Sequence, residues 1–170
     1  MSATGVGPDR VRELLGRFAT GVTIVTTRTA DRRPLGMTAN AVASVSLQPP
    51  LMLVCVDRTR EMHDALHRAA YFALNVLAAD QEALSRRFAE DHADRFAGLP
   101  VLTGPHDLPL LPDVVAHIIC ATRDAAPAGD HTIFTGLVVG GTATDRPPLT
   151  YFRGSYGVLA STQSGPNAHR

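Results

Sequence analysis

The sequence contains no lysine, so all 16 of its basic residues are arginine. This absence excludes three kinds of site that need a lysine amine: the phosphate-binding P-loop, the Schiff base and the serine–lysine nucleophile pair. The 16 acidic residues balance the arginines and bring the formal net charge to zero. A neutral chain does not favour a polyanionic partner, so we expect no nucleic-acid binding.

Cysteines and long apolar runs are also scarce. The two cysteines, Cys55 and Cys120, both lie inside apolar stretches, which is typical of buried free thiols in a reducing compartment. The longest unbroken apolar run, residues 51–56, is far too short to span a membrane. The opening residues MSATGVGPDR hold no apolar core of a signal peptide. We therefore expect a cytoplasmic protein with no membrane partner.

The 170 residues suffice for one domain with a sizeable core. Helical apolar spacing follows Asp9, Thr59 and Asp80, each of which can cap a helix. Six or seven strands are expected, at residues 22–28, 36–47, 51–56, 71–77, 114–124, 132–144 and 150–160. Residues 103–113 read as a proline-rich loop, and Gly140-Gly141 as a bulge. Because helices and strands do not alternate, we predict a largely antiparallel sheet closed into a barrel, with the helices outside.

Residues 36–47 show the clearest strand pattern. Apolar residues occupy every odd position from Met37 to Leu47, and the even positions are polar except for Val42. This period of two predicts extended chain with the odd positions facing inward. Three of those inward positions, at 39, 41 and 43, carry only alanine, which packs little and is a poor strand former.

Searches for other motifs exclude several kinds of site. The sequence has no GxGxxG motif after a strand, no GxSxG motif and no cysteine pair at zinc spacing. His63 and His67 lie four residues apart, and two solvated histidines are favoured over a metal site. For Arg86-Arg87 a solvated helix face is favoured over a phosphate site. His131 fits a cavity-facing histidine and a turn histidine equally well.

Five segments point to one family: RFATGVTIVTT (17–27), GMTANAVASVSLQPPLMLVCV (36–56), FALNVLAADQEALSRRFA (72–89), AGDHTIFTGLV (128–138) and PPLTYFRGSYGVL (147–159). In this order they resemble the flavin reductase-like family, the small NAD(P)H:flavin oxidoreductases that serve two-component monooxygenases. The resemblance implies an FMN-binding split β-barrel of antiparallel Greek-key type that forms homodimers. It places the domain at residues 10–160, between an N-terminal extension at 1–9 and a disordered tail at 161–170.

The same resemblance implies an activity and a partner. A hydride would pass from NADH or NADPH to FMN or FAD, and the reduced flavin would supply a separate flavin-dependent monooxygenase. His131 would orient the nicotinamide, and Tyr151 and Arg153 would line the same pocket. The implied flavin-binding residues are Met37, Thr38, Ala39, Asn40, Ser44, Val45, Ser46, Cys55, Asp57, Thr59, Ser85, Arg86 and Phe88.

Two features of that set have a physical basis in the sequence. Small side chains at positions 37–46 allow a flat ring to approach the backbone, and hydroxyls suit the polar edge of the ring. At a helix start, Thr59 would offer free backbone N–H groups to the flavin phosphate. Asp57 is a departure, because many relatives are expected to have a neutral residue there and a carboxylate repels a phosphate unless Arg58 or Arg60 offsets it.

Two alternatives remain open on the sequence. The first is a non-catalytic split-barrel protein that binds flavin or haem, with His92 or His117 as a possible iron ligand. The second is a flavoenzyme that oxidises its own small substrate, as pyridoxamine phosphate oxidases do on a related barrel. The segments AGDHTIFTGLV (128–138) and PPLTYFRGSYGVL (147–159) argue against this second alternative.

Overall fold

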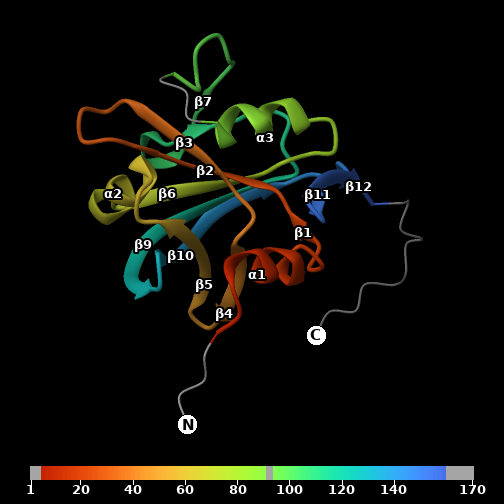
Figure 1. Ribbon diagram of the computed structural model, residues 1–170. Coiled ribbons are helices and arrows are strands. Elements are labelled where there is room, and N and C mark those ends of the chain that lie inside the picture. The colour runs from red at the N-terminus through yellow and green to blue at the C-terminus, as the bar shows by residue number, and fades with distance from the viewer. Residues whose placement is uncertain (1–4, 91–93, 160–170) are drawn as a thin grey trace.

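The computed structural model of the protein describes residues 5–90 and 94–159. Within them lie three α-helices, a short 3-10 turn at Pro105–Asp107 and twelve strands (Figure 1). The helices are α1 (Pro8–Leu15), α2 (Glu61–Arg68) and α3 (Glu82–Ala89). The strands are β1 (Thr20–Gly21), β2 (Thr23–Arg28), β3 (Pro34–Ala39), β4 (Val42–Leu47), β5 (Pro50–Asp57), β6 (Tyr71–Val76), β7 (Leu102–Thr103), β8 (Pro109–Leu110), β9 (Ala116–Ala128), β10 (His131–Ala143), β11 (Leu149–Phe152) and β12 (Ser155–Val158). The predicted tail at 161–170 lies outside the described residues.

Seven strands form one antiparallel sheet in the order β3-β2-β6-β9-β10-β5-β4. Its two edge strands, β3 and β4, follow each other in the chain and are separated only by Asn40 and Ala41. Two residues span at most about 7 Å, so the sheet must curl until its opposite edges approach each other. Small sheets β1-β11-β12 and β7-β8 complete the fold.

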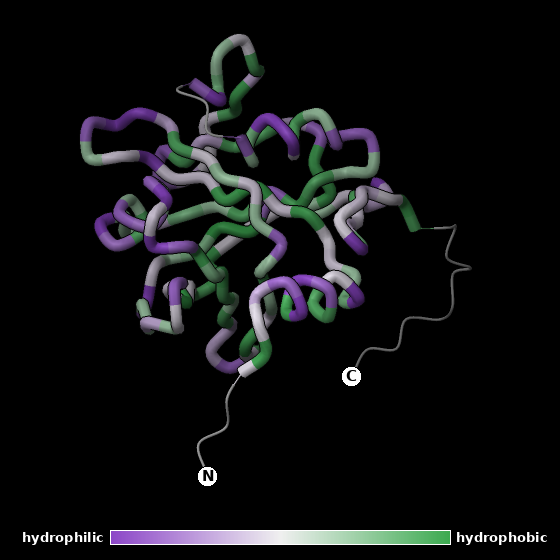
Figure 2. Tube along the Cα trace, in the orientation of Figure 1, coloured by the Kyte–Doolittle hydropathy of each residue, from purple (hydrophilic) through white to green (hydrophobic). Residues whose placement is uncertain are grey.

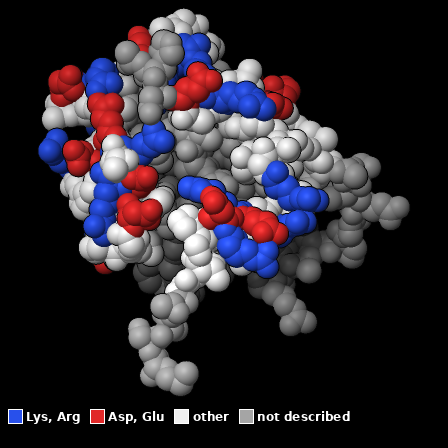
Figure 3. Space-filling view, viewed as in Figure 1, with Lys and Arg blue, Asp and Glu red and all other residues white. Residues whose placement is uncertain are grey.

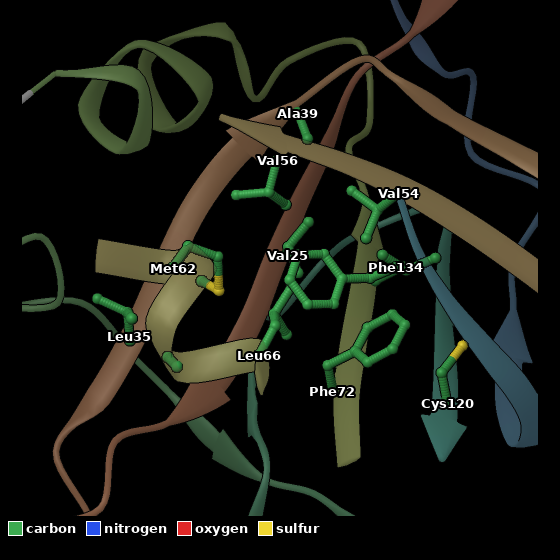
Figure 4. Packing of buried hydrophobic residues seen from close by; sticks show 12 residues of the cluster. Val25, Leu35, Ala39, Val54, Val56, Met62, Leu66, Phe72, Cys120 and Phe134 are labelled. Carbon is green, nitrogen blue, oxygen red and sulfur yellow. The ribbon is translucent and has the colours of Figure 1, made fainter. Parts of the chain in front are cut away.

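The main core lies inside this curl. Val25, Val54, Phe72 and Phe134 from four strands are fully buried, and Leu66 of α2 packs among them (Figure 4). A second cluster lies under α3, where the rings of Phe88 and Phe96 meet edge to face with centroids 4.9 Å apart. The tube coloured by hydropathy shows apolar segments along the central strands (Figure 2).

The predicted class, mainly β with three helices and antiparallel pairing, is confirmed, whereas the strand count was too low. Residues 103–113 were expected to be a loop but contain β7, the 3-10 turn and β8. Residues 150–160 were expected to hold one strand, and the hairpin β11–β12 lies there instead. The register of β9 and β10 shifts between Val138 and Gly140, which confirms the predicted irregularity.

Three predicted helix caps were wrong. The residues before the helices are Gly7, Arg60 and Gln81, and none of their side chains makes a capping hydrogen bond. At α2 the reason is local: the backbone N–H and hydroxyl of Thr59 both donate to Asp57 Oδ1, each at 2.8 Å. Thr59 therefore completes a turn with Asp57, and the helix starts two residues later.

The predicted inward face of residues 36–47 was correct only for the first half. Met37 and Ala39 pack on the core, but beyond the joint at 40–41 the core-facing residue is Val42. Ala41, Ala43 and the other odd positions of β4 are exposed, with Leu47 at 84% exposure. The two-residue joint changes which positions face inward, because each strand pairs with a different neighbour.

Helix α1 confirms the predicted helix but not its burial. Within the described chain none of its residues is buried, and Leu14, Leu15 and the following Phe18 are 49%, 67% and 76% exposed. It lies beside the β11–β12 hairpin (Figure 1), where the N–H of Arg153 donates to the carbonyl of Gly16 at 2.8 Å. The apolar side of α1, comprising Val11, Leu14, Leu15 and Phe18, is thus an uncovered surface, called the α1 face below.

Candidate functional site

A hollow of about 190 Å³ lies where β3, the end of α3 and the β11–β12 hairpin meet. We call it the tyrosine pocket. The rings of Tyr151 and Tyr156 stand on one side, with centroids 5.2 Å apart. The residues that line it are Val22, Thr38, Asn40, Ala89, Tyr151 and Tyr156.

Hydrogen bonds fix the wall of this pocket. Thr38 Oγ1 donates to the carbonyl of Ser85 at 2.7 Å, and the hydroxyls of Ser85 and Tyr156 lie 2.9 Å apart. The guanidinium of Arg86 lies over the Tyr156 ring, 4.8 Å from its centroid, a cation–π arrangement. The hydrogen bond that Arg86 donates to the Glu82 carboxylate raises the pKa of Arg86, which remains a cation. Side chains from three separate segments therefore hold one another in place around the pocket.

Tyr156 was not among the predicted site residues, although its neighbours Tyr151 and Arg153 were. Tyr151 and Tyr156 are direct partners across β11 and β12, so their side chains share one face of the hairpin. Arg153 instead lies at the turn of the hairpin, where its φ is 51° and its N–H contacts Gly16. Recognising a hairpin centred on Arg153-Gly154 would have paired the two tyrosines from sequence.

The predicted residues of α3 shape the pocket from behind. Ser85 and Phe88 are fully buried, and only Arg86 of the three is exposed. Gly36 is essential to this packing, because a Cβ there would lie 2.4 Å from the Phe88 ring. Arg87 donates to the carbonyls of Arg95 and Ala97, so it fastens a loop rather than facing a phosphate.

A second group of polar residues lies where β5 ends and β10 begins. We call it the His131 rim. His131 is the strand partner of Asp57, and its Nδ1 lies 2.7 Å from Asp130 Oδ1. The hydrogen bond with His131 is the main reason that the pKa of Asp130 is lowered. The two hydrogen bonds from Thr59, backbone first, lower the pKa of Asp57, with smaller contributions from His131 and Arg60.

The segment 38–41 joins the tyrosine pocket to the His131 rim. Thr38 and Asn40 line the pocket, and the carbonyl of Ala41 accepts a hydrogen bond from Cys55 N at 3.0 Å, two residues before Asp57. Asn40 is exposed, as is Ala41. The Cys55 thiol has a pKa raised by burial, so it is not a reactive thiolate. The predicted residues 37–40 thus lie at the end of β3 and the joint, and this joint is hydrogen-bonded to β5, which carries residues 55 and 57 and pairs with β10 at His131.

Three predicted flavin residues lie further along the chain. Ser44 and Ser46 pair with Met52 and Leu51 on β5, at the opposite end of that strand from Asp57. Ser46 Oγ accepts a hydrogen bond from Gln48 N at 3.2 Å, and Val45 is 48% exposed. Within one chain these residues therefore do not join the tyrosine pocket or the His131 rim.

His63 and His67 were expected to be solvated, which was wrong for His63. Its Nε2 lies 3.0 Å from Thr132 Oγ1, and its ring lies edge-on to those of His67 and Phe134. Across residues 5–90 and 94–159, no group of three potential ligands that could hold a metal ion is found.

The possible haem ligands gain no support. Both ring nitrogens of His117 already have partners, Nδ1 with Thr142 Oγ1 at 3.0 Å and Nε2 with the carbonyl of Leu111 at 2.8 Å. His92 lies outside the described residues.

A larger hollow of about 420 Å³ beside β3 contains none of the predicted site residues. Its charged side chains are already engaged: Arg33 pairs with Glu61, and Arg95 donates to the carbonyl of Gly36 at 3.0 Å. We therefore locate the candidate site at the smaller tyrosine pocket and the His131 rim. In the described parts of the chain, no helix is long and apolar enough to cross a membrane.

Residues 15–160 match the family model "Flavin reductase like domain", so the chain belongs to that family. It is 42% identical to a flavin reductase (NADH) of Kitasatospora aureofaciens, covering 89% of this chain and 81% of the relative. It is 40% identical to a probable flavin reductase of Rhizobium meliloti over 92% of this chain, which spans only 50% of that relative.

Among solved structures, the chain is similar to the NADH:FAD oxidoreductase of Streptomyces globisporus in complex with NAD and FAD fragments. The TM-score is 0.83 at 39% identity, covering 98% of this chain and 100% of that one.

Proposed function

We propose that the protein is a flavin reductase that oxidises NADH and reduces FMN or FAD, and that residues 10–160 form its catalytic domain. The observation that carries this proposal is that the joint at residues 40–41 connects the tyrosine pocket to β5 two residues before Asp57 and the His131 rim, in a chain of the flavin reductase-like family. The names of the relatives support NADH as the hydride donor.

The residues around the joint at 40–41 suit a flat ring with polar atoms on its rim. Ala41 and Ala43 present only methyl groups to solvent, so a ring can approach the backbone closely. The exposed Asn40 amide can donate to and accept from ring heteroatoms. When bound, the flavin supplies the hydride-accepting ring and the dinucleotide supplies the hydride. The protein's own contribution is to orient the two rings and exclude water.

His131 is proposed as the residue that orients the nicotinamide. Its Nδ1 is engaged by Asp130, which fixes the ring and leaves Nε2 for a ligand. Its 42% side-chain exposure makes it accessible at the rim. Tyr151 is proposed to line the nicotinamide site together with Tyr156. Arg153 lies at the turn of the hairpin, so it would reach that site only if a partner subunit or a bound ligand brought the two together.

We propose further that the protein is a cytoplasmic homodimer with the split-barrel fold. The edges of the curled sheet meet at residues 40–41, as a split barrel requires. The α1 face and the exposed odd positions of β4 are apolar surfaces that a second copy would cover. In such a dimer Ser44, Val45 and Ser46 would reach the flavin of the partner subunit or lie at the interface.

The reduced flavin is proposed to supply a separate monooxygenase. This part of the proposal draws on relatives such as the reductase component of the trigonelline monooxygenase of Acinetobacter baylyi, which is 42% identical.

Steady-state NADH oxidation with riboflavin, FMN and FAD tests the function, and His131→Ala tests the site. We expect the KM for NADH to rise about 5- to 10-fold in His131→Ala, the value of one lost hydrogen bond, while flavin affinity stays nearly constant. His67→Gln is the control, because His67 is an exposed histidine of α2 whose ring contacts His63 and Phe134. Unchanged kinetics in His131→Ala would remove the assignment, and flavin binding without NADH oxidation would favour the non-catalytic alternative.

A further inference from the structure

We propose that His63 and Thr132 are positioning residues for the reaction: the buried hydrogen bond between them holds the start of β10 against α2 and thereby places His131 at the rim. This inference rests on the proposed function, because His131 is the residue proposed to orient the nicotinamide. Both residues act through the backbone of β10 and not through contact with a cofactor or substrate.

His63 is an enclosed histidine on α2. Only 14% of its side chain is exposed, and its Nε2 lies 3.0 Å from Oγ1 of Thr132, which is itself 3% exposed. The other ring nitrogen, Nδ1, lies 3.3 Å from Asp64 Oδ1. A carboxylate only accepts hydrogen bonds, so Nδ1 carries the proton. Nε2 therefore accepts a hydrogen bond from the Thr132 hydroxyl.

Thr132 is the first buried residue of β10, and His131 precedes it at the start of the strand. Successive side chains of a strand point to opposite faces of the sheet. Thr132 thus faces α2 and the core, while the His131 side chain points the other way and is 42% exposed. The contact with His63 fixes the strand residue next to His131, at the point where β10 leaves the turn.

The loop between β5 and α2 connects the same helix to the other side of the rim. The N–H of His63 donates to the carbonyl of Arg60 at 2.9 Å, and the N–H of Arg60 donates to the carbonyl of Asp57 at 3.1 Å. Asp57 is the strand partner of His131. Together with the contact to Thr132, these bonds form a closed path that starts and ends at His131. Helix α2 and the two strand ends therefore move as one unit.

The surroundings show that a polar pair here does more than add stability. Thr132 pairs with the fully buried Val56 on β5. Beside His63 lie the buried Met62 and the ring of Phe134, whose centroid is 5.7 Å from that of His63 (Figure 4). In such a place, apolar groups of the same shape can replace both partners of a hydrogen bond at little cost in stability. A hydrogen bond is directional, however, and fixes one position of α2 against β10.

Thr132→Val tests the proposal, because valine keeps the shape of threonine and removes only the hydroxyl. We expect the KM for NADH to rise about threefold, part of the effect of His131→Ala, while the dissociation constant of FMN stays constant. Thr132→Ser retains the hydroxyl and should keep the KM of the unmodified protein. Thr122→Val is the matched control, because the Thr122 hydroxyl is buried without a hydrogen-bond partner in the described chain.

Two combinations separate positioning from stability. In the His131→Ala background, Thr132→Val should raise the KM for NADH no further, because Thr132 acts through His131. In His63→Leu/Thr132→Val both partners are apolar, so its urea midpoint should be no lower than that of Thr132→Val. Its KM should nevertheless remain raised, which a merely structural role does not explain.

The imidazole Cε1–H NMR signal of His131, assigned with His131→Ala, gives a measurement that needs no turnover. It should shift or broaden in Thr132→Val and stay unchanged in Thr122→Val. An unchanged His131 signal in Thr132→Val would overturn the proposal, as would a further rise in KM on the His131→Ala background. If Thr132→Val does not fold, the doubly apolar variant takes its place, and failure of both to fold would show a structural role instead. Absence of NADH oxidation with every flavin would refute the proposed function, and the NMR comparison would still decide the positioning of His131.

Discussion

Helices α1 and α2 are alike in length and in their one-sided apolar pattern, but not in burial. Both have eight residues with apolar side chains gathered on one side. Helix α2 buries Met62, Ala65 and Leu66 against the curled sheet, whereas no residue of α1 is buried in the described chain. The comparison shows that helical spacing identifies the apolar face of a helix but not the surface that covers it.

Chain connections account for much of the difference. Helix α2 begins four residues after the end of β5 and ends three residues before the start of β6, so both of its ends are fixed to strands of the same sheet. Helix α1 precedes the first strand, and a backbone hydrogen bond between Gly16 and Arg153 holds its end to the β11–β12 hairpin. A helix attached in this way can contribute its apolar face to a contact between subunits.

The largest expected effect is on the covered helix. Leu66→Ala removes a fully buried side chain from the main core. We expect it to lower the free energy of unfolding by about 2–5 kcal/mol, the range for leucine-to-alanine cavities. Urea denaturation followed by circular dichroism gives the value. A loss below about 1 kcal/mol would mean that α2 is not the essential cover of the core.

A substitution on the uncovered helix α1 should affect association between subunits and leave the stability of the monomer nearly unchanged. Leu15→Arg on the α1 face should change the free energy of unfolding of a monomer by no more than about 0.5 kcal/mol, because Leu15 is 67% exposed. In a dimer that buries the α1 face, the same change should weaken association about tenfold or more. Sedimentation equilibrium measures the association constant, with Arg12→Gln on the polar side as control. Unaltered dimerisation in Leu15→Arg would exclude α1 from the interface.

The two cysteines of the sheet show the same contrast between a buried and a less buried position. The expected difference in their reactivity is the smallest of the three effects. Cys120 is fully buried in the main core, and burial raises its pKa to about 12. Cys55 is only partly buried, although burial raises its pKa as well. In the native protein we expect one thiol to react with a chromogenic disulfide and the other only after unfolding, with a rate that increases with pH as thiolate forms. Mass spectrometry of the labelled peptides should identify Cys55, and prior labelling of Cys120 would contradict the packing.

Much of the fold could be predicted from short-range patterns. Runs such as VTIVTT and YFALNV are rich in β-branched or apolar residues, and they are strands β2 and β6. The side-chain orientation along residues 36–47 could not be predicted, because the two-residue joint lies inside a pattern that continues past it. The local alternation is the same on both sides, and only the pairing of each half with a different strand decides which residues face inward.

The part of the candidate site that lies at strand ends could be predicted from the sequence. His131 and Asp57 lie together because one begins β10 and the other ends β5. The sequence indicated a strand next to each residue, but it did not indicate that these two strands pair. The donors of Thr59 could not be placed from sequence, since their use depends on whether Asp57 folds back on them. Tyr156 was missed because the closing segment was read as one strand instead of a hairpin.

The joint at Asn40 and Ala41 has a mechanical consequence for the whole molecule. It connects the first and last strands of the seven-stranded sheet, and the candidate site lies along it. A molecule bound there would contact both edge strands, β3 and β4, and would oppose their separation. Occupancy would therefore slow hydrogen exchange on strands remote from the ligand, since opening either margin first requires the ligand to leave.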